Sequence, residues 1–177
     1  GTTLLAASML AAGAASAAIT VQATANYNGH TYQLLSAANW VDSEAFAVTQ
    51  GGHLVAVNDA AENTFLNNTW GANNYLWIGL FRTTPNVNTF AWTNGDAVTY
   101  TNWSAGEPNN YYGEDYAHTY RDGTWNDLDS VSTYASPQYG VVEISAVPEP
   151  ETYALMLAGL GLVGGIARRR AKKAAAV

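Results

Sequence analysis

The sequence contains no cysteine among its 177 residues. A disulfide framework and a thiolate metal site are therefore excluded, so packing, hydrogen bonds and any bound ion must stabilise the fold. Basic residues are also scarce, because five of the seven lie within the last ten positions. The rest of the chain lacks the basic surface that binding to nucleic acid requires.

The part of the chain that precedes the basic tail is strongly acidic. Its only basic residues are Arg82 and Arg121. With Glu149 and Glu151 assigned to the tail, 12 acidic residues stand against 2 basic ones, a net charge of −10. This surplus either keeps the surface solvated or serves in part to bind a divalent cation.

The N-terminal segment is apolar and rich in alanine. It ends in Ala15-Ser16-Ala17, which has the small residues of a signal-peptide cleavage site. We expect residues 1–17 to be the remnant of a secretory signal peptide. A buried Ala-rich helix is the alternative, although such small side chains offer little surface for packing.

The C-terminal segment, 147–177, has three parts. Pro148-Glu149-Pro150 is followed by an apolar stretch at 152–167 and by the basic cluster. The stretch is shorter than the roughly 20 residues that cross a bilayer comfortably, and the basic cluster favours the cytoplasmic side. The segment resembles the PEP-CTERM sorting signal of Gram-negative bacteria. The resemblance implies transient anchoring in the inner membrane through 152–167, removal by an exosortase-type enzyme, and release into the cell envelope or extracellular matrix. A permanent single-pass anchor is the alternative.

The middle of the chain alternates helical and strand patterns before it becomes a series of short strands. Ser36 is the expected cap of a first helix, and Asp59 with Glu62 forms a capping box for a second helix through about Asn68. Apolar residues recur at helical spacing in the first helix, at Ala37, Trp40, Val41, Ala47 and Val48. The expected strands are 29–35, 53–57, 75–80, 89–92, 116–120, 123–125 and 139–144.

A loop of about twenty residues, 94–114, has little strand pattern, and loops of this length inside a domain are usually functional. Oxygen-bearing side chains gather in this loop and just after it: Glu107, Asn109, Glu114, Asn126 and Asp127. Carboxylate and amide oxygens without imidazole or thiolate suit Ca²⁺ rather than Zn²⁺ or copper. A cis bond before Pro108 would turn the side chains of Glu107 and Asn109 to the same side.

Five motifs in this order resemble the C-type lectin-like domain family, over about residues 28–144. They are Gly51-Gly52-His53-Leu54-Val55, Trp77-Ile78-Gly79-Leu80, the run from Trp103 to Asn109, Glu114-Asp115, and Trp125-Asn126-Asp127. The resemblance implies an α+β fold for residues 18–146, with two helices, short antiparallel sheets and a long calcium-binding loop.

The resemblance also implies residue roles. Glu107, Asn109, Glu114, Asn126 and Asp127 match the calcium ligands, and the same five contact the sugar. Two vicinal sugar hydroxyls coordinate the ion, donate to a carboxylate and accept from an amide. Three charged ligands would make the ion-free site repel itself. The Glu-Pro-Asn form resembles members that bind mannose, glucose, N-acetylglucosamine or fucose. We expect Tyr112 to contact the sugar as well; Tyr111 is the alternative, and packing of both rings onto the domain is a third interpretation.

Departures from the family pattern lead to further expectations. The two disulfides of the family would fall at Ala47 with Val142 and at Tyr116 with Ser130, so packing must replace them. An auxiliary calcium site is expected to be absent, because Arg82, Asn86 and Asn110 stand where acidic residues are needed.

The function predicted from these residues is calcium-dependent binding of exopolysaccharide or another glycan at the bacterial surface or in the matrix of a biofilm. A calcium-stabilised structural or protein-interaction module is the alternative. We expect no enzyme activity, because no catalytic arrangement is visible and carboxylates that bind calcium are poor proton donors. The four tryptophans at 77, 92, 103 and 125 are assigned to the core, and no metal or catalytic role is assigned to the histidines.

Overall fold

A computed structural model describes residues 18–130, 137–145, 156–158 and 160. The expected signal remnant at 1–17 lies outside the described residues, as does nearly all of the tail at 147–177. In the part of the chain that is described, no helix has both the length and the apolar character needed to cross a membrane.

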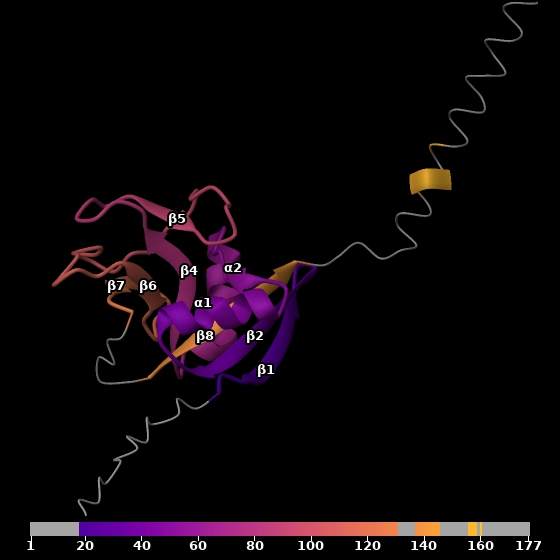
Figure 1. Cartoon of the computed structure of the whole chain (residues 1–177), viewed down its shortest axis with the longest axis horizontal. Coiled ribbons are helices and arrows are strands. Elements are labelled where there is room, and N and C mark those ends of the chain that lie inside the picture. Colours follow the sequence, from indigo (N-terminus) through magenta and orange to yellow (C-terminus); the bar gives the residue numbers. More distant parts are fainter. Residues whose placement is uncertain (1–17, 131–136, 146–155, 159, 161–177) are drawn as a thin grey trace, which may run out of the picture.

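One mixed sheet of eight strands and two helices build the domain (Figure 1). The strands are β1 (Val21–Tyr27), β2 (His30–Ala37), β3 (His53–Leu54), β4 (Tyr75–Arg82), β5 (Phe90–Trp92), β6 (Tyr116–Thr119), β7 (Trp125–Leu128) and β8 (Gln138–Ser145). The helices are α1 (Trp40–Thr49) and α2 (Ala60–Leu66), and a short π-helix, η1 (Asn67–Gly71), continues α2. The α+β class expected from the sequence is confirmed.

The strand order is β1-β2-β8-β4-β6-β7, with β3 paired to β8 and β5 paired to β4. The strand pairs are antiparallel, as expected, except β4 with β8, which is parallel. β4 lies in the middle of the strand order, and its C-terminal end leads into β5 and then into the long loop. That loop returns to β6 and β7, which places the candidate site at one end of the sheet.

The start of α1 differs from the expectation. Asn39, not Ser36, is the cap, and its side chain accepts a hydrogen bond from the amide of Asp42 at 2.8 Å. Ser36 lies in β2, which extends to Ala37 because it pairs with β1 on one side and β8 on the other. Of the apolar positions at helical spacing, Trp40 and Ala47 are buried in α1, whereas Val41 and Val48 are 49% and 54% exposed.

The start of α2 agrees with the expected capping box. Asp59 accepts from the amide of Glu62 at 2.8 Å. The carboxylate of Glu62 accepts from the amide of Asn58 at 2.8 Å and from the hydroxyl of Tyr32 at 2.6 Å. The cap therefore also ties α2 to β2.

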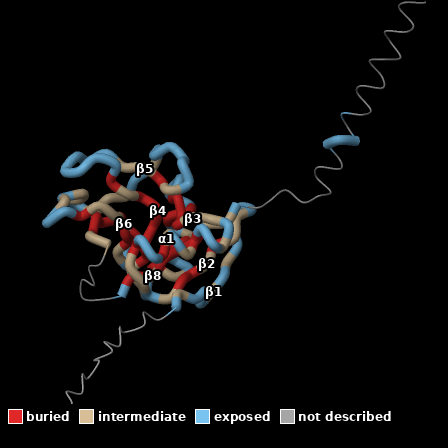
Figure 2. The backbone as a smooth tube through the Cα atoms, viewed as in Figure 1, coloured by how far each residue is buried: buried red, intermediate tan, exposed pale blue. Residues whose placement is uncertain are grey.

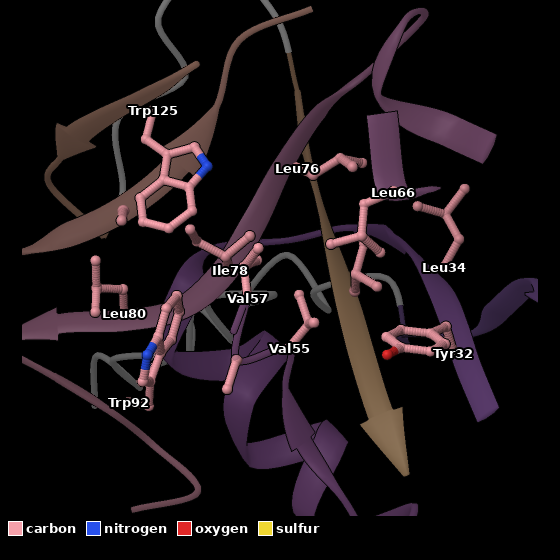
Figure 3. Packing of buried hydrophobic residues seen from close by; sticks show 13 residues of the cluster. Tyr32, Leu34, Val55, Val57, Leu66, Leu76, Ile78, Leu80, Trp92 and Trp125 are labelled. Atoms are coloured by element: carbon pink, nitrogen blue, oxygen red, sulfur yellow. The ribbon is translucent and has the colours of Figure 1, made fainter. Parts of the chain in front are cut away.

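Tryptophan rings occupy the centre of the core, where burial is continuous along the middle strands (Figure 2). Trp77 and Trp125 have no exposed surface, and Trp92 is 2% exposed. Trp92 and Trp103 both pack edge-on against Trp125, with ring centroids 5.9 and 5.8 Å away. Figure 3 shows Trp92 and Trp125 among the aliphatic side chains of the same cluster. The prediction that these tryptophans form core rather than a binding surface is confirmed for the three that are buried.

Apolar packing occupies the positions at which the family has disulfides. Ala47 and Val142 are completely buried in one cluster with Leu35, which joins α1, β8 and β2. At the second position, the ring of Tyr116 lies 4.4 Å from that of Trp40, and the carbonyl of Ser130 accepts from the amide of Trp40 at 3.3 Å. At the first position, packing joins the same two elements as the covalent link, whereas at the second position Tyr116 and Ser130 are both held by Trp40 of α1.

We predict that Leu35→Ala lowers the free energy of unfolding by about 2–5 kcal/mol, because it leaves a cavity where α1 meets the sheet. Val48→Ala on the exposed face of α1 is the matched control and should change stability by no more than about 0.5 kcal/mol. Urea denaturation followed by tryptophan fluorescence measures both. Equal effects of the two substitutions would contradict the assignment of this cluster as the replacement for the covalent link.

Candidate functional site

The long loop between β5 and β6 is organised mainly by its contacts with β7. The amide of Trp125 donates to the carbonyl of Asn102, and the amide of Ser104 donates to the carbonyl of Trp125, both at 2.8 Å. The loop therefore runs beside β7 before it reaches the Glu-Pro-Asn turn. This pairing brings that turn next to Asn126 and Asp127.

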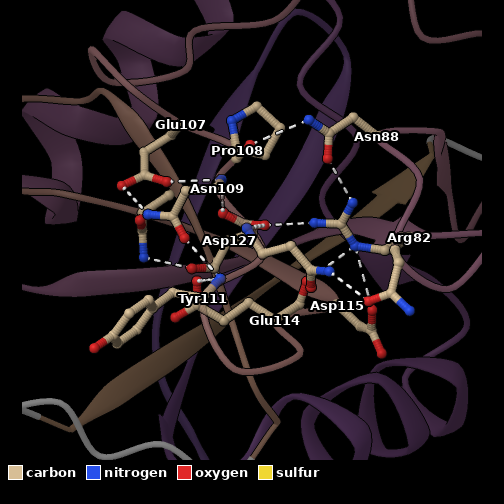
Figure 4. Close-up of polar contacts among 12 residues, drawn as sticks. Arg82, Asn88, Glu107, Pro108, Asn109, Tyr111, Glu114, Asp115 and Asp127 are labelled. Carbon is tan, nitrogen blue, oxygen red and sulfur yellow. Dashed lines mark hydrogen bonds and ion pairs between the residues drawn. The ribbon is translucent and has the colours of Figure 1, made fainter.

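The turn has the geometry expected from the sequence. The bond between Glu107 and Pro108 is cis. Asn109 donates to the carboxylate of Glu107 through its side-chain Nδ2 at 2.9 Å and through its backbone amide at 3.0 Å (Figure 4). The polar ends of these two side chains lie together.

Asp127 holds the turn from the interior of the domain, where it has no exposed surface. Its Oδ1 accepts from the amide of Asn109 and its Oδ2 from the amide of Asn110, both at 3.0 Å. Oδ2 also lies 2.5 Å from Nη2 of Arg82. The carboxylate of Asp127 therefore links the turn to β4.

Arg82 is a fully buried cation at the end of β4. Besides Asp127, its guanidinium donates to the carbonyl of Glu114 at 3.0 Å and to the carbonyl of Val87 at 2.9 Å. It also donates to Oδ1 of Asn88 at 2.7 Å, and its Nε lies 3.3 Å from Asp115. One side chain thus joins β4, the connection to β5, the end of the long loop and β7 (Figure 4).

A pocket of about 290 Å³ opens beside the turn. Its lining includes four of the five side chains assigned to calcium: Glu107, Asn109, Glu114 and Asn126. The fifth, Asp127, lies behind this lining. Tyr111 also lines the pocket, whereas Tyr112 does not and is 90% exposed. The two tyrosine rings lie 4.2 Å apart at the tip of the loop.

Burial and negative charge act together on the carboxylates of the pocket. Burial and, after it, the nearby charge of Asp127 together raise the pKa of Glu114 to about 7. The pKa of Glu107 is raised by the same two causes. Glu107 and Glu114 both lie near the carboxylate of Asp127. Arg82 forms its ion pair with Asp127 and not with the two carboxylates that line the pocket.

The donor set fits a calcium ion by its chemistry, since carboxylate and amide oxygens are the preferred ligands of this hard cation. Among the described residues, no group of three or more His, Cys, Asp or Glu side chains is arranged to hold a metal by itself. The structure gives a reason, because Asp127 directs its Oδ2 toward Arg82. Amide oxygens from Asn109 and Asn126 are therefore needed to complete such a site.

The auxiliary positions hold no acidic side chain. Arg82 provides a buried positive charge there, and Asn110 donates to the side chain of Asn86 at 2.9 Å. These contacts close the surface between the β4–β5 connection and the turn.

Five residues of this region were missed from the sequence: Arg82 as a positioning group, and Tyr75, His118, Tyr120 and Leu128 as pocket lining. Nε2 of His118 accepts a hydrogen bond from Nδ2 of Asn126, 3.1 Å away, and burial lowers the pKa of His118 to about 4. A sequence signal existed, because His118 and Tyr120 lie four and six positions after Glu114, at the two-residue spacing of side chains that share one face of a strand. No comparable signal marks Tyr75, which precedes an apolar run.

Comparison with protein families gives two matches. The C-type lectin domain matches residues 36–135, and the PEP-CTERM protein-sorting motif matches residues 146–171. The first match lies in the middle of the chain and the second near its C-terminal end.

Curated relatives share about a third of their aligned residues with this chain. The Alpha-N-acetylgalactosamine-specific lectin of Patiria pectinifera is 34% identical over 116 residues, which is 58% of this chain and 68% of that lectin. C-type lectin domain family 17, member A, of Homo sapiens is 34% identical over 98 residues, but these cover only 26% of that protein. The chain thus corresponds to about a quarter of the human relative.

Solved structures agree on the fold. The C-type lectin CEL-I from Cucumaria echinata aligns with a TM-score of 0.62 at 27% identity, over 70% of this chain and 96% of that one. A calcium-independent type II antifreeze protein aligns with a TM-score of 0.62 over 74% of this chain and 98% of its own. At 21% identity, the second likeness shows the fold alone.

We predict that Arg82→Met lowers the free energy of unfolding by about 3–5 kcal/mol in calcium-free buffer, because it leaves Asp127 buried without its partner. Guanidinium denaturation in the presence of a chelator measures this loss. The double variant Arg82→Met/Asp127→Asn removes both charges and should recover part of it. A loss below about 1 kcal/mol in the single variant would show that the ion pair does not organise the loop.

Proposed function

The chain belongs to the C-type lectin domain family, and from this premise we propose that it binds carbohydrate through a calcium ion. The ligands of the ion are Glu107, Asn109, Glu114, Asn126 and Asp127. The observation that carries the proposal is that four of these side chains, from the loop and from β7, line one pocket while the fifth holds the turn from behind.

A bound calcium ion would take two vicinal sugar hydroxyls into its coordination shell. The residues of the chain would orient these hydroxyls through paired hydrogen-bond donors and acceptors. Nδ2 of Asn109 and Oε1 of Glu107 lie 2.9 Å apart. One sugar hydroxyl can accept from this amide and donate to this carboxylate. Asn126 and Glu114, which both line the pocket, are the proposed partners of the second hydroxyl.

Mannose- or glucose-type sugars are the proposed class, because the turn reads Glu-Pro-Asn. Family members that bind galactose usually have Gln-Pro-Asp at this turn. Tyr111 lines the pocket and is 56% exposed, so its ring is the nearer one for contact with a sugar face. Tyr112, next to it, is proposed to contact ligand outside the pocket. A single small site binds weakly, so several copies on a surface would gain affinity through multivalency.

A structural or interaction module of the same fold is the second candidate. It is favoured by the commitment of Asp127 to Arg82, which organises the loop without requiring an ion. The antifreeze protein that aligns with this chain is named as calcium-independent. In this candidate the pocket binds no sugar, and the surface beside the loop makes the functional contact.

Catalysis is not part of either candidate, because the C-type lectin domain is a binding domain and not an enzyme. The two pocket carboxylates, Glu107 and Glu114, are explained by binding. Each already accepts hydrogen bonds from backbone amides of the turn.

The sorting motif supports the proposed location of the domain. We propose that residues 1–17 direct export, that 18–146 form the lectin domain, and that 147–177 are recognised by an exosortase-type enzyme. The apolar segment at 152–167 then serves as a transient membrane anchor. The mature domain acts in the cell envelope or extracellular matrix, where it holds exopolysaccharide.

We predict that the protein binds mannose in the presence of calcium and that a chelator abolishes this binding. Asn109→Asp should weaken mannose binding about tenfold or more, because it replaces a hydrogen-bond donor to the sugar with a charged acceptor. Isothermal titration with Ca²⁺, followed by mannose, N-acetylglucosamine and N-acetylgalactosamine, measures each step.

Asn26→Asp, the same chemical change on the exposed strand β1, is the matched control and should leave both titrations unchanged. Heat from calcium without heat from any sugar supports the second candidate. No heat from calcium contradicts the proposed ion site.

We predict a shorter mature protein in a host that has an exosortase, because the anchor is removed after the Pro-Glu-Pro sequence. Intact-mass measurement should show the loss of residues 152–177 in that host, whereas the chain should keep them in a host without the enzyme. Equal masses in the two hosts would support a permanent anchor.

A further inference from the structure

The pocket extends beyond the proposed ion ligands, and the inference that follows rests on the proposed function. Its lining has two parts. The oxygen donors form one part. The other part is aromatic and apolar and contains Tyr75, His118, Tyr120 and Leu128.

Strand pairing shows in which direction the second part lies. His118 is directly opposite Asn126 in the β6–β7 pair. Tyr120 follows two residues later, about 7 Å further along the strand direction. Leu76 pairs with Thr119, which places Tyr75 beside the same stretch of β6. The rings therefore run from the ion ligands toward the β6–β7 turn.

These rings contact one another and form a continuous wall. The ring centroid of Tyr75 lies 5.8 Å from that of His118 and 6.3 Å from that of Tyr120. His118 and Tyr120 are 5.2 Å apart at an angle of 74°. An apolar wall of this kind suits the C–H face of a sugar ring that follows the ion-bound one.

A positive charge lies against this wall. Arg121 is the first residue of the turn, and its guanidinium carbon lies 5.2 Å from the ring centroid of Tyr75. Arg121 is exposed, and it makes no ion pair within the described part of the chain. Its neighbour Asp122 is held by Thr124, whose amide and hydroxyl both donate to it.

The charge of Arg121 is unusual in this domain. Arg82 and Arg121 are its only arginines, it has no lysine, and Arg82 is completely buried. With a net charge of −10, the rest of the domain repels an anionic polymer. Arg121 therefore places the exposed positive charge of the domain beside the pocket, where it can attract an anionic polymer.

We propose that the aromatic wall and Arg121 form a second subsite, which takes an acidic sugar linked to the ion-bound one. The wall contacts the ring of this sugar, and Arg121 pairs with its carboxylate. The preferred ligand is then an acidic polysaccharide in which a uronic acid neighbours a mannose-type residue.

Two disaccharides that differ in one group test the subsite. In the first, glucuronic acid is linked to O2 of mannose, which leaves the 3- and 4-hydroxyls of mannose free; in the second, its carboxylate is reduced to a hydroxymethyl group. With the full chain and saturating calcium, we expect the acidic form to bind about two- to fivefold more tightly, as for a solvent-exposed ion pair. The preference should disappear in high salt.

Arg121→Gln should lower the affinity for the acidic disaccharide to the affinity for the reduced one. Arg121→Lys should keep part of this difference in affinity. Gln22→Glu, on the opposite edge strand β1, changes the net charge by the same amount and should preserve the full preference. Equal binding of the two disaccharides by the unsubstituted protein overturns this inference but leaves the proposed function intact. A preference that survives in Arg121→Gln also overturns it. Failure of both disaccharides to bind in calcium overturns the proposed function and this inference together.

Discussion

The buried pair of Arg82 and Asp127 is the interaction on which the functional end of this domain depends. Asp127 holds the backbone of the turn, and Arg82 connects that carboxylate to β4 and to the end of the long loop. The sequence alone suggested three carboxylates that repel one another until calcium arrives. With Arg82 included, the side chains of Glu107, Glu114, Asp127 and Arg82 sum to −2, which a divalent cation neutralises. The loop is therefore held together by a charge that belongs to the chain, and ion binding acts on a turn that is already positioned.

Local patterns carried most of what could be predicted. The capping box at Asp59 and the turn around Pro108 involve neighbours in the sequence, and both have the expected geometry. The tryptophan core was predictable because such large rings are expensive to leave in water. The convergence of oxygen donors from the loop and β7 followed from a family resemblance, not from local pattern, since nothing in the residues alone pairs Glu107 with Asn126.

The errors arose where a partner distant in sequence decides the structure. β1 has Gln, Thr and Asn in alternation with alanine, so it lacks an apolar signal, yet it forms six paired positions with β2. Pairing of Ala37 with Tyr139 of β8 continues β2 past Ser36, and the helix cap is Asn39. In the same way, Arg82 resembled a simple departure from the family pattern until its partners on four segments were known. The aromatic wall also depends on β4 and β6 lying side by side.

The replacement of both family disulfides by packed side chains has a consequence for where this domain can be used. The contacts of Ala47 with its cluster and of Tyr116 with Trp40 form as the chain folds and need no electron acceptor. Folding of the lectin domain therefore requires neither a thiol oxidase nor a disulfide isomerase. Its framework does not depend on the presence of oxygen, and reductants leave it unchanged.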